Sequence, residues 1–209
     1  MKVNPPLQLR CLFLHGLESG VNGKKSQYLG KHFENVTVPD LQTGYLNFNS
    51  NSFLTSSIRN ILKIFNGRWF EEITTDVLEG ATEIVRISLE NEPYKPDIIV
   101  ASSMGGAIAL ECLRKGIIPR NIPLLLLAPA LKLVILGWQD KSSSNRLQEW
   151  YESFRNSGEI IENITIIHGT LDNIVNIDNS RELCHSLGSN KVCLFEVLFS
   201  FHFKSCFFH

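Results

Sequence analysis

Two short runs of the chain are continuously apolar, and they constrain the fold more than any other feature. Residues 98–100 read Ile-Ile-Val, and residues 124–127 are four successive leucines. A half-exposed strand alternates apolar and polar side chains, whereas a strand covered by helices on both faces is apolar throughout. The two runs therefore predict central strands of a parallel sheet with helices on both sides.

The rest of the chain alternates short apolar runs with segments of helical periodicity. Six strands are predicted, at 9–14, 35–38, 97–102, 123–128, 163–168 and 191–197. Helices are predicted at 77–89, from 106 to a stop at Gly116, and at 178–187. This order predicts an α/β fold, a three-layer α/β/α sandwich around a mostly parallel sheet of about six strands.

Two segments, 45–72 and 131–160, lie outside this alternation. Both carry apolar residues at helical spacing: Ile58, Ile61, Leu62 and Phe65 in the first, and Leu147, Trp150, Tyr151 and Phe154 in the second. Such a stripe is typical of a surface helix packed on the core, and the alternative is a lid over a site. A lid or cap is considered for 131–160 because that segment lies between two predicted strands.

Composition and charge exclude several classes of partner. A chain of 209 residues with 44% hydrophobic and 20% charged residues can bury one core, so a single domain over 1–209 is predicted. The net charge of −1 argues against nucleic acid or an anionic membrane surface. No apolar run is long enough to span a bilayer, and the N-terminal residues lack a signal-peptide pattern. Five scattered cysteines without a C-x-x-C pair favour a reducing, cytoplasmic setting.

The segment 101–105, Ala-Ser-Ser-Met-Gly, lies where a predicted strand gives way to a predicted helix. This places Ser103 at the apex of a tight turn. Small residues two before and two after it, Ala101 and Gly105, let the turn close as in the G-x-S-x-G nucleophile elbow. Ser103 is therefore the candidate nucleophile, and the alternative is an ordinary strand-to-helix turn.

A serine nucleophile needs a base and a carboxylate that orients the base. Asp172 follows the predicted strand 163–168, and His202 follows the strand 191–197. The chain order Ser103, Asp172, His202 is the nucleophile, acid, histidine order of the α/β-hydrolases. His185 lies within the predicted helix 178–187 and is expected to be a surface or packing residue, while His209 is a further candidate base.

A tetrahedral intermediate also needs N–H donors for its oxyanion. The backbone amide of Met104, directly after the nucleophile, is the first candidate. The second is the backbone amide of Leu17, in the loop after the first strand, where Gly16 allows close approach to the substrate. His15 in the same loop is expected to stiffen it by hydrogen bonding rather than to act as a base.

Three stretches, 13–16, 102–106 and 168–172, together resemble the α/β-hydrolase family, especially its small microbial-type esterases and thioesterases. The resemblance covers residues 9 to 203. It implies Ser103 as nucleophile, His202 as general base and then acid, and Asp172 as the group that fixes the imidazole.

The chain departs from the family pattern at three places. Asn176 replaces a common proline, and Ser200 and Phe201 precede the histidine where the family often has Gly-Asp or Asp-Asp. An aromatic stretch, 203–208, stands where a terminal helix usually follows the histidine. It is expected either to pack on the sheet or to leave His202 loosely held.

Other readings of the sequence fit less well. Residues 20–26 resemble a phosphate-binding loop but lack its required residues in either alignment. Lys24 and Lys25 are expected to form a solvated basic turn, the alternative being attraction of an anionic substrate such as an acyl-CoA. A haloalkane-dehalogenase-like mechanism would need an aspartate at the position of Ser103.

The expected protein is therefore a serine esterase or thioesterase. Its expected partner is a small-molecule acyl ester or thioester, with no nucleic acid and no integral membrane association. No cofactor or metal is implied, since neither H-E-x-x-H nor paired C-x-x-C occurs. The alternatives are a catalytically inactive binding module and an acyltransferase.

Overall fold

The structure, a computed structural model, describes residues 5–16, 20–42, 69–136, 144–156, 163–188 and 192–198. Six parallel strands form one sheet in the order β2-β1-β3-β4-β5-β6. They are β1 (Leu7–Leu14), β2 (Phe33–Thr37), β3 (Ile98–Ser102), β4 (Leu124–Leu127), β5 (Ile164–Gly169) and β6 (Val192–Val197). All six predicted strands are confirmed, with their ends shifted by one or two residues.

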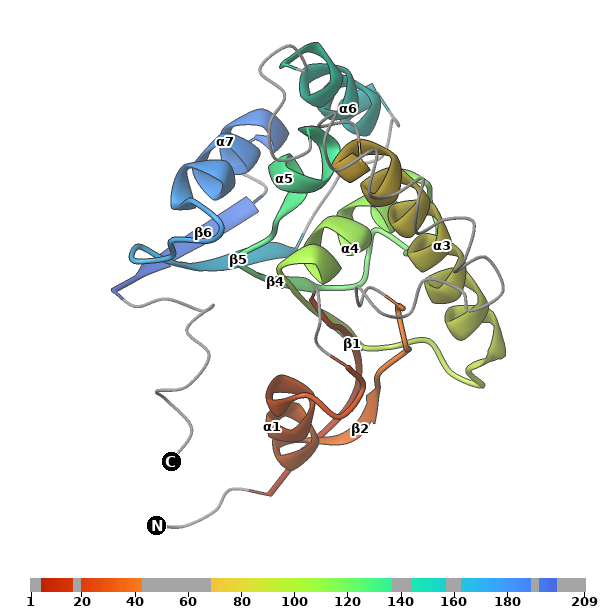
Figure 1. Ribbon diagram of the computed structural model, residues 1–209. Helices are drawn as coiled ribbons and strands as arrows, with labels where there is room; N and C mark the ends of the chain where they lie inside the picture. The colour runs from red at the N-terminus through yellow and green to blue at the C-terminus, as the bar shows by residue number, and fades with distance from the viewer. Residues whose placement is uncertain are drawn as a thin grey trace.

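In the part of the chain that the structure describes, helices cover the two faces of the sheet unequally (Figure 1). One face carries α3 (Trp69–Asn91), α4 (Met104–Arg114), α5 (Leu131–Leu136), α6 (Ser144–Asn156) and α7 (Ile177–Leu187). In the described part of the chain the other face carries α1 (Lys24–His32), whose Leu29 packs on Cys11, Phe13 and Val100. The predicted helices at 77–89, 106–116 and 178–187 correspond to α3, α4 and α7.

The leucine run of β4 shows this asymmetry directly. Leu124 and Leu126 are buried in the main core beneath α4, but Leu125 and Leu127, on the α1 side, are half-buried. Further along that side, Phe195 of β6 is 57% exposed. The expectation that β4 is covered on both faces is therefore met in part, because α1 lies at the β1 and β2 end of the sheet.

The segment 131–160 contributes two helices, α5 and α6. Leu147, Trp150, Tyr151 and Phe154 of α6 are all buried in the main core. The Trp150 indole N–H also donates to the Glu111 carboxylate of α4, at 2.8 Å. The apolar stripe of α6 therefore packs on the core, and a lid function for this segment stays a prediction. The residues of 45–72 that suggested a helix lie outside the described residues.

Several smaller expectations concern single residues. Gly116 ends α4 with φ 72°, as expected of a C′ glycine. Cys11 and Cys112 are free and buried, and burial raises the pKa of each thiol to about 12, so they act as small apolar residues. No helix in the described part of the chain has the length and hydropathy needed to cross a bilayer.

One ion pair links Arg10, within β1, to Asp97, the residue before β3. Asp97, just before β3, accepts hydrogen bonds from the Arg10 backbone N–H at 2.8 Å, from its Nε at 2.9 Å and from its Nη2 at 2.7 Å. These bonds to Arg10 lower the pKa of Asp97 to about 2, from an ordinary value of 3.8. The pair fixes the register of β1 against β3.

This pair predicts a specific loss of stability in acid. Because the pKa of Asp97 is depressed in the folded chain, its contribution is fully present above about pH 4 and disappears as the pH falls towards 2. Asp97→Asn is therefore expected to lower the free energy of unfolding at neutral pH, with a difference from wild type that shrinks between pH 4 and pH 2. Urea unfolding over a pH series measures it. In an Arg10→Met background, which keeps the backbone N–H bond to Asp97 but loses both guanidinium bonds, this pH dependence should become smaller, and a pH dependence of undiminished size would contradict the assignment.

Candidate active site

Ser103 lies at the tip of the turn between β3 and α4, with φ 54° and ψ −118°. A serine rarely adopts positive φ, so the surroundings must hold it there. Its N–H donates to the Leu127 carbonyl at 2.9 Å, and its carbonyl accepts from the amides of Gly106 at 2.9 Å and Ala130 at 3.0 Å. The predicted elbow is present as a strained turn that β4 and the residues after it keep in place.

Two glycines let this turn approach the end of β1. A Cβ on Gly105 would lie 2.2 Å from the Leu14 carbonyl oxygen and 2.5 Å from that of His15. A Cβ on Gly16 would lie 3.1 Å from Ser103 Cβ and 3.7 Å from its Oγ. The first turn of α4 and the loop after β1 are therefore in direct backbone contact beside the serine hydroxyl.

The position of this contact in the sheet is informative. From β1 the strand order runs to β2 on one side and to β3 on the other, so the connections diverge at the β1–β3 pair. Open α/β sheets bind ligands in the crevice at the carboxyl ends of the strands at such a switch point. Ser103 and the loop carrying Gly16 both lie at that edge.

His15 belongs to the framework of this crevice. Its Nε2 accepts from the Leu41 N–H at 3.3 Å, which leaves the proton on Nδ1, and Nδ1 lies 3.0 Å from the Gly16 carbonyl oxygen. The ring is 2% exposed. The prediction that His15 stiffens the loop by hydrogen bonding is confirmed.

Two backbone amides were predicted as oxyanion donors. Met104 is the first residue of α4, where N–H groups have no partner within the helix. The carbonyl of Ser103 takes the amides of Gly106 and Ala107, but no acceptor for the Met104 N–H occurs among the described residues. Leu17 lies outside the described residues.

Asp172 follows β5 and has a side chain with no exposed surface. Its Oδ1 accepts from the N–H groups of Ile174 and Val175, each at 3.0 Å, so one oxygen closes a tight turn. Its Oδ2 lies 3.9 Å from His168 Nε2. The carboxylate is thus fixed in orientation at the carboxyl end of β5, two strands along the sheet from the end of β3.

His168 is the histidine nearest to Asp172 among the described residues, but it is built into the core. Its Nε2 lies 2.8 Å from the Val175 carbonyl, which can only accept, so Nε2 carries the proton. Its Nδ1 lies 2.7 Å from the Ser180 hydroxyl oxygen. The ring ties β5 to the following turn and to α7, and it is not a candidate base for Ser103.

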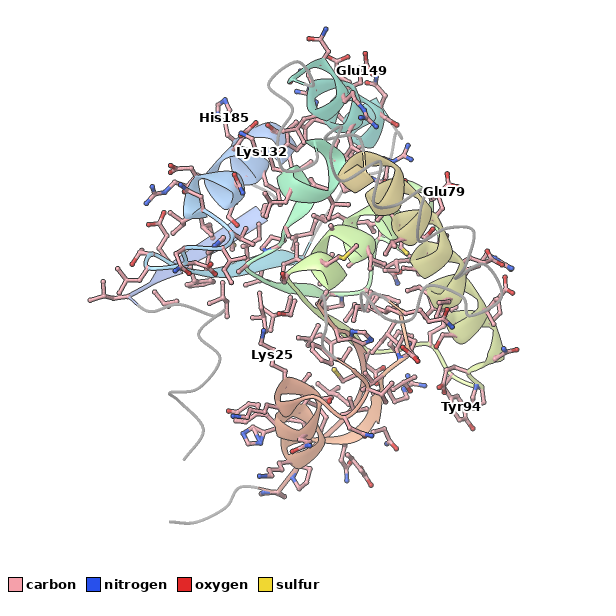
Figure 2. All side chains as sticks on the ribbon, viewed as in Figure 1. Lys25, Glu79, Tyr94, Lys132, Glu149 and His185 are labelled. Atoms are coloured by element: carbon pink, nitrogen blue, oxygen red, sulfur yellow. The ribbon has the colours of Figure 1, made fainter. Side chains whose placement is uncertain are left out.

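The remaining histidines divide between solvent and undescribed segments. His185 is exposed on α7 and points away from the sheet (Figure 2), which confirms that it is a surface residue. His202 and His209 lie outside the described residues. Asn176, which replaces the family's proline, accepts from the Asp178 N–H at 2.9 Å and caps α7.

The expectation that Lys25 lies in a solvated basic turn is wrong. The expected basic turn is instead the start of α1, which begins at Lys24 after Gly23. Lys25 is half-buried, and its Nζ donates to the Ser102 hydroxyl at 2.7 Å (Figure 2). Burial lowers the pKa of this amine, and the nearby Asp172 carboxylate opposes that shift. The signal in the sequence was weak, because α1 buries few of its side chains.

Comparison with known proteins finds similar solved structures but no match to the sequence. No family model matches the chain, and no curated protein matches its sequence. The chain is similar in structure to TT1662 from Thermus thermophilus, at 16% identity and a TM-score of 0.60 over 93% of this chain and 82% of that one. It is also similar to Est1E from Butyrivibrio proteoclasticus, at 13% identity and a TM-score of 0.54 over 94% and 80%.

A third similar structure is the 2-hydroxy-6-oxo-6-phenylhexa-2,4-dienoate hydrolase BphD from Rhodococcus sp. strain RHA1. It is 14% identical, with a TM-score of 0.50 over 91% of this chain and 82% of that one. The chain has the α/β-hydrolase fold. Its six parallel strands, and the turn at Ser103 between β3 and α4, are the parts of that fold on which the proposed chemistry depends.

Proposed function

We propose that this protein is a serine hydrolase that cleaves carboxylic esters or thioesters through an acyl-enzyme intermediate. The observation that carries the proposal is the backbone of Ser103, held at φ 54° between β3 and α4. A strained serine at a strand-to-helix turn serves to present its hydroxyl at the top of the sheet. The low-identity likeness to structures named as hydrolases adds support at the level of the fold.

In the proposed reaction Ser103 Oγ attacks the acyl carbonyl while His202 accepts the hydroxyl proton. The Met104 and Leu17 amides bind the oxyanion of the tetrahedral intermediate. His202 then returns the proton to the leaving alcohol or thiol, which departs and leaves the acyl group on Ser103. Water, deprotonated by His202, attacks the acyl-enzyme, and the acid is released with the proton back on Ser103.

Asp172 is assigned the orienting role, and this assignment predicts a large kinetic effect. Asp172→Asn keeps an oxygen that can accept from Ile174 and Val175, so the turn is expected to survive. Loss of the negative charge should nevertheless lower kcat by about 10⁴-fold, as when a triad carboxylate is replaced by an amide. Steady-state hydrolysis of p-nitrophenyl butyrate measures the effect.

The matched control for this variant is Asp178→Asn. Asp178 is an exposed carboxylate on α7 whose side chain is 69% exposed and pairs with Arg181. It should retain wild-type activity. Equal losses of kcat in the two variants would contradict the assignment of Asp172 to the site.

The proposal is tested by hydrolysis of p-nitrophenyl acetate, butyrate and octanoate by the wild type and by His202→Ala. Activity that His202→Ala abolishes supports the assignment, and the chain-length profile sizes the acyl pocket. Activity that survives His202→Ala would move the base to His209. A folded protein that cleaves none of the esters would contradict the proposal and favour a binding module. Products formed with added alcohols or amines separate acyl transfer from hydrolysis.

A further inference from the structure

The proposed triad and oxyanion donors give no role to Lys25, a charged residue described at this edge of the sheet. Lys25 reaches from α1 towards the carboxyl edge of the sheet (Figure 2), where its Nζ lies 2.7 Å from the hydroxyl of Ser102. Ser102 is the residue before the proposed nucleophile and is 2% exposed. The Lys25 ammonium therefore contacts the residue that directly precedes Ser103 in the chain.

Among the described residues, the hydrogen bonds of the Lys25 ammonium do not neutralise its positive charge. An ammonium has three donors, and within the described residues Lys25 makes one hydrogen bond, to a neutral hydroxyl. A described carboxylate with an electrostatic effect on it is Asp172. The Oδ1 of that carboxylate accepts from two amides of its own turn.

The neighbouring lysine provides a contrast within one turn of helix. Lys24 carries the same charge at the start of α1 but is exposed. A solvated ammonium at Lys24 needs no partner from the protein, whereas the half-buried one at Lys25 loses part of its hydration. Only Lys25 is held where a substrate beside Ser103 could contact it.

We infer that Lys25 is a specificity-determining residue that binds a carboxylate of the substrate, so that the preferred substrates are esters carrying a negative charge near the scissile bond. This inference rests on the proposed function. A substrate carboxylate would accept hydrogen bonds from the remaining ammonium donors and compensate a charge that, among the described residues, is hydrogen-bonded to Ser102 alone. Charge-assisted hydrogen bonds of this kind are the strong ones.

The test compares matched charged and neutral esters. One arm pairs the p-nitrophenyl monoester of adipic acid with p-nitrophenyl hexanoate, placing the charge in the acyl part. The other pairs 4-carboxyphenyl butyrate with 4-acetylphenyl butyrate, placing it in the alcohol part. The wild type is expected to prefer the charged ester in one arm, by about ten- to a hundredfold in kcat/KM after subtraction of spontaneous hydrolysis.

Three variants test whether the preference for the charged ester depends on the Lys25 amine. Lys25→Met should abolish it by slowing cleavage of the charged ester while changing the neutral one by less than about threefold. Lys25→Arg should keep it, since the charge remains. Lys24→Met, which removes the same charge one residue away, should leave both rates unchanged and so controls for long-range electrostatics.

The outcomes separate the two proposals. Ser103-dependent cleavage of neutral esters with no preference in either arm overturns the inference alone. Equal losses on charged and neutral esters in Lys25→Met, or the same loss in Lys24→Met, also overturn it, because they indicate a structural or long-range effect. If Lys25→Met fails to fold, the wild type and Lys25→Arg still test the inference. A wild type without the preference for a charged ester, or a Lys25→Arg variant that loses it, overturns the inference, and a preference present in both supports it. A folded wild type that cleaves no ester overturns both proposals.

Discussion

Replacing Ser103 with alanine is expected to lower kcat for ester hydrolysis by about four to six orders of magnitude. The substitution removes the only atom that can form the proposed acyl-enzyme bond. The backbone should persist, because the hydrogen bonds that hold the turn come from Leu127, Gly106 and Ala130 and involve only main-chain atoms of Ser103. Hydrolysis of p-nitrophenyl butyrate measures the loss, and thermal unfolding checks that the variant is folded.

Ser102→Ala is the matched control, since it removes a hydroxyl one residue earlier. That hydroxyl is buried and bonded to Lys25, so its loss should alter cleavage of a neutral ester by less than about tenfold. A reversed result, with Ser102→Ala inactive and Ser103→Ala active, would mean that the turn presents a different nucleophile from the one proposed.

Gly105→Ala is expected to be strongly disruptive, because the added Cβ would make closer contacts than one added at Gly16. A methyl group there would lie 2.2 Å from the Leu14 carbonyl oxygen and 2.5 Å from that of His15, and both are backbone atoms that cannot rotate away. Either α4 or the end of β1 must move, at a cost of about 3 kcal/mol or more. Because the same contact places Ser103 beside the loop of Gly16, activity should fall together with stability.

Gly80→Ala controls for the intrinsic preference of alanine over glycine in a helix. Gly80 lies within α3, and a Cβ there meets nothing within 4 Å. That variant should be more stable than the wild type, by about 0.5–1 kcal/mol. Urea unfolding of both variants tests the account, which a tolerated Gly105→Ala would contradict.

The sheet could be predicted from the sequence because its strands are short, apolar and separated by strong signals. The runs at β3 and β4 are apolar throughout, and Gly116 marks the end of α4 as expected. The asymmetry of the layers could not be predicted. An apolar run indicates that a strand can be buried on both faces. Leu125 is nevertheless only half-buried, because coverage of the second face of the sheet depends on where α1 lies.

The same limit explains why α1 and the half-buried position of Lys25 were not predicted. Residues 24–32 are mostly polar, and Ser26 is the one residue of this helix that is buried. The sequence therefore shows no apolar stripe from which the helix could be predicted. The charge of Lys25 suggested a solvated turn because a lysine side chain is exposed in most proteins. Its hydrogen bond to Ser102 joins residues 77 positions apart in the chain, which no local pattern can indicate.

The positions of the candidate site residues were predictable to different degrees. The tight turn at Ser103 could be predicted because small residues flank it. The place of Asp172 after β5 could also be predicted, although its Oδ1 closes the local turn, as that of any aspartate there would. His168 shows the converse, since only the contacts with Val175 and Ser180 reveal that a histidine near this carboxylate is a framework residue.

The most direct test of the central claim is covalent labelling with a fluorophosphonate, followed by mass mapping of the modified peptide. Such probes react with a serine that a base and an oxyanion site have activated. The account predicts one adduct per chain, located on Ser103 and absent from Ser103→Ala. A folded protein that forms no adduct, or that carries it on Ser102 or another residue, would contradict the assignment of Ser103 as the nucleophile.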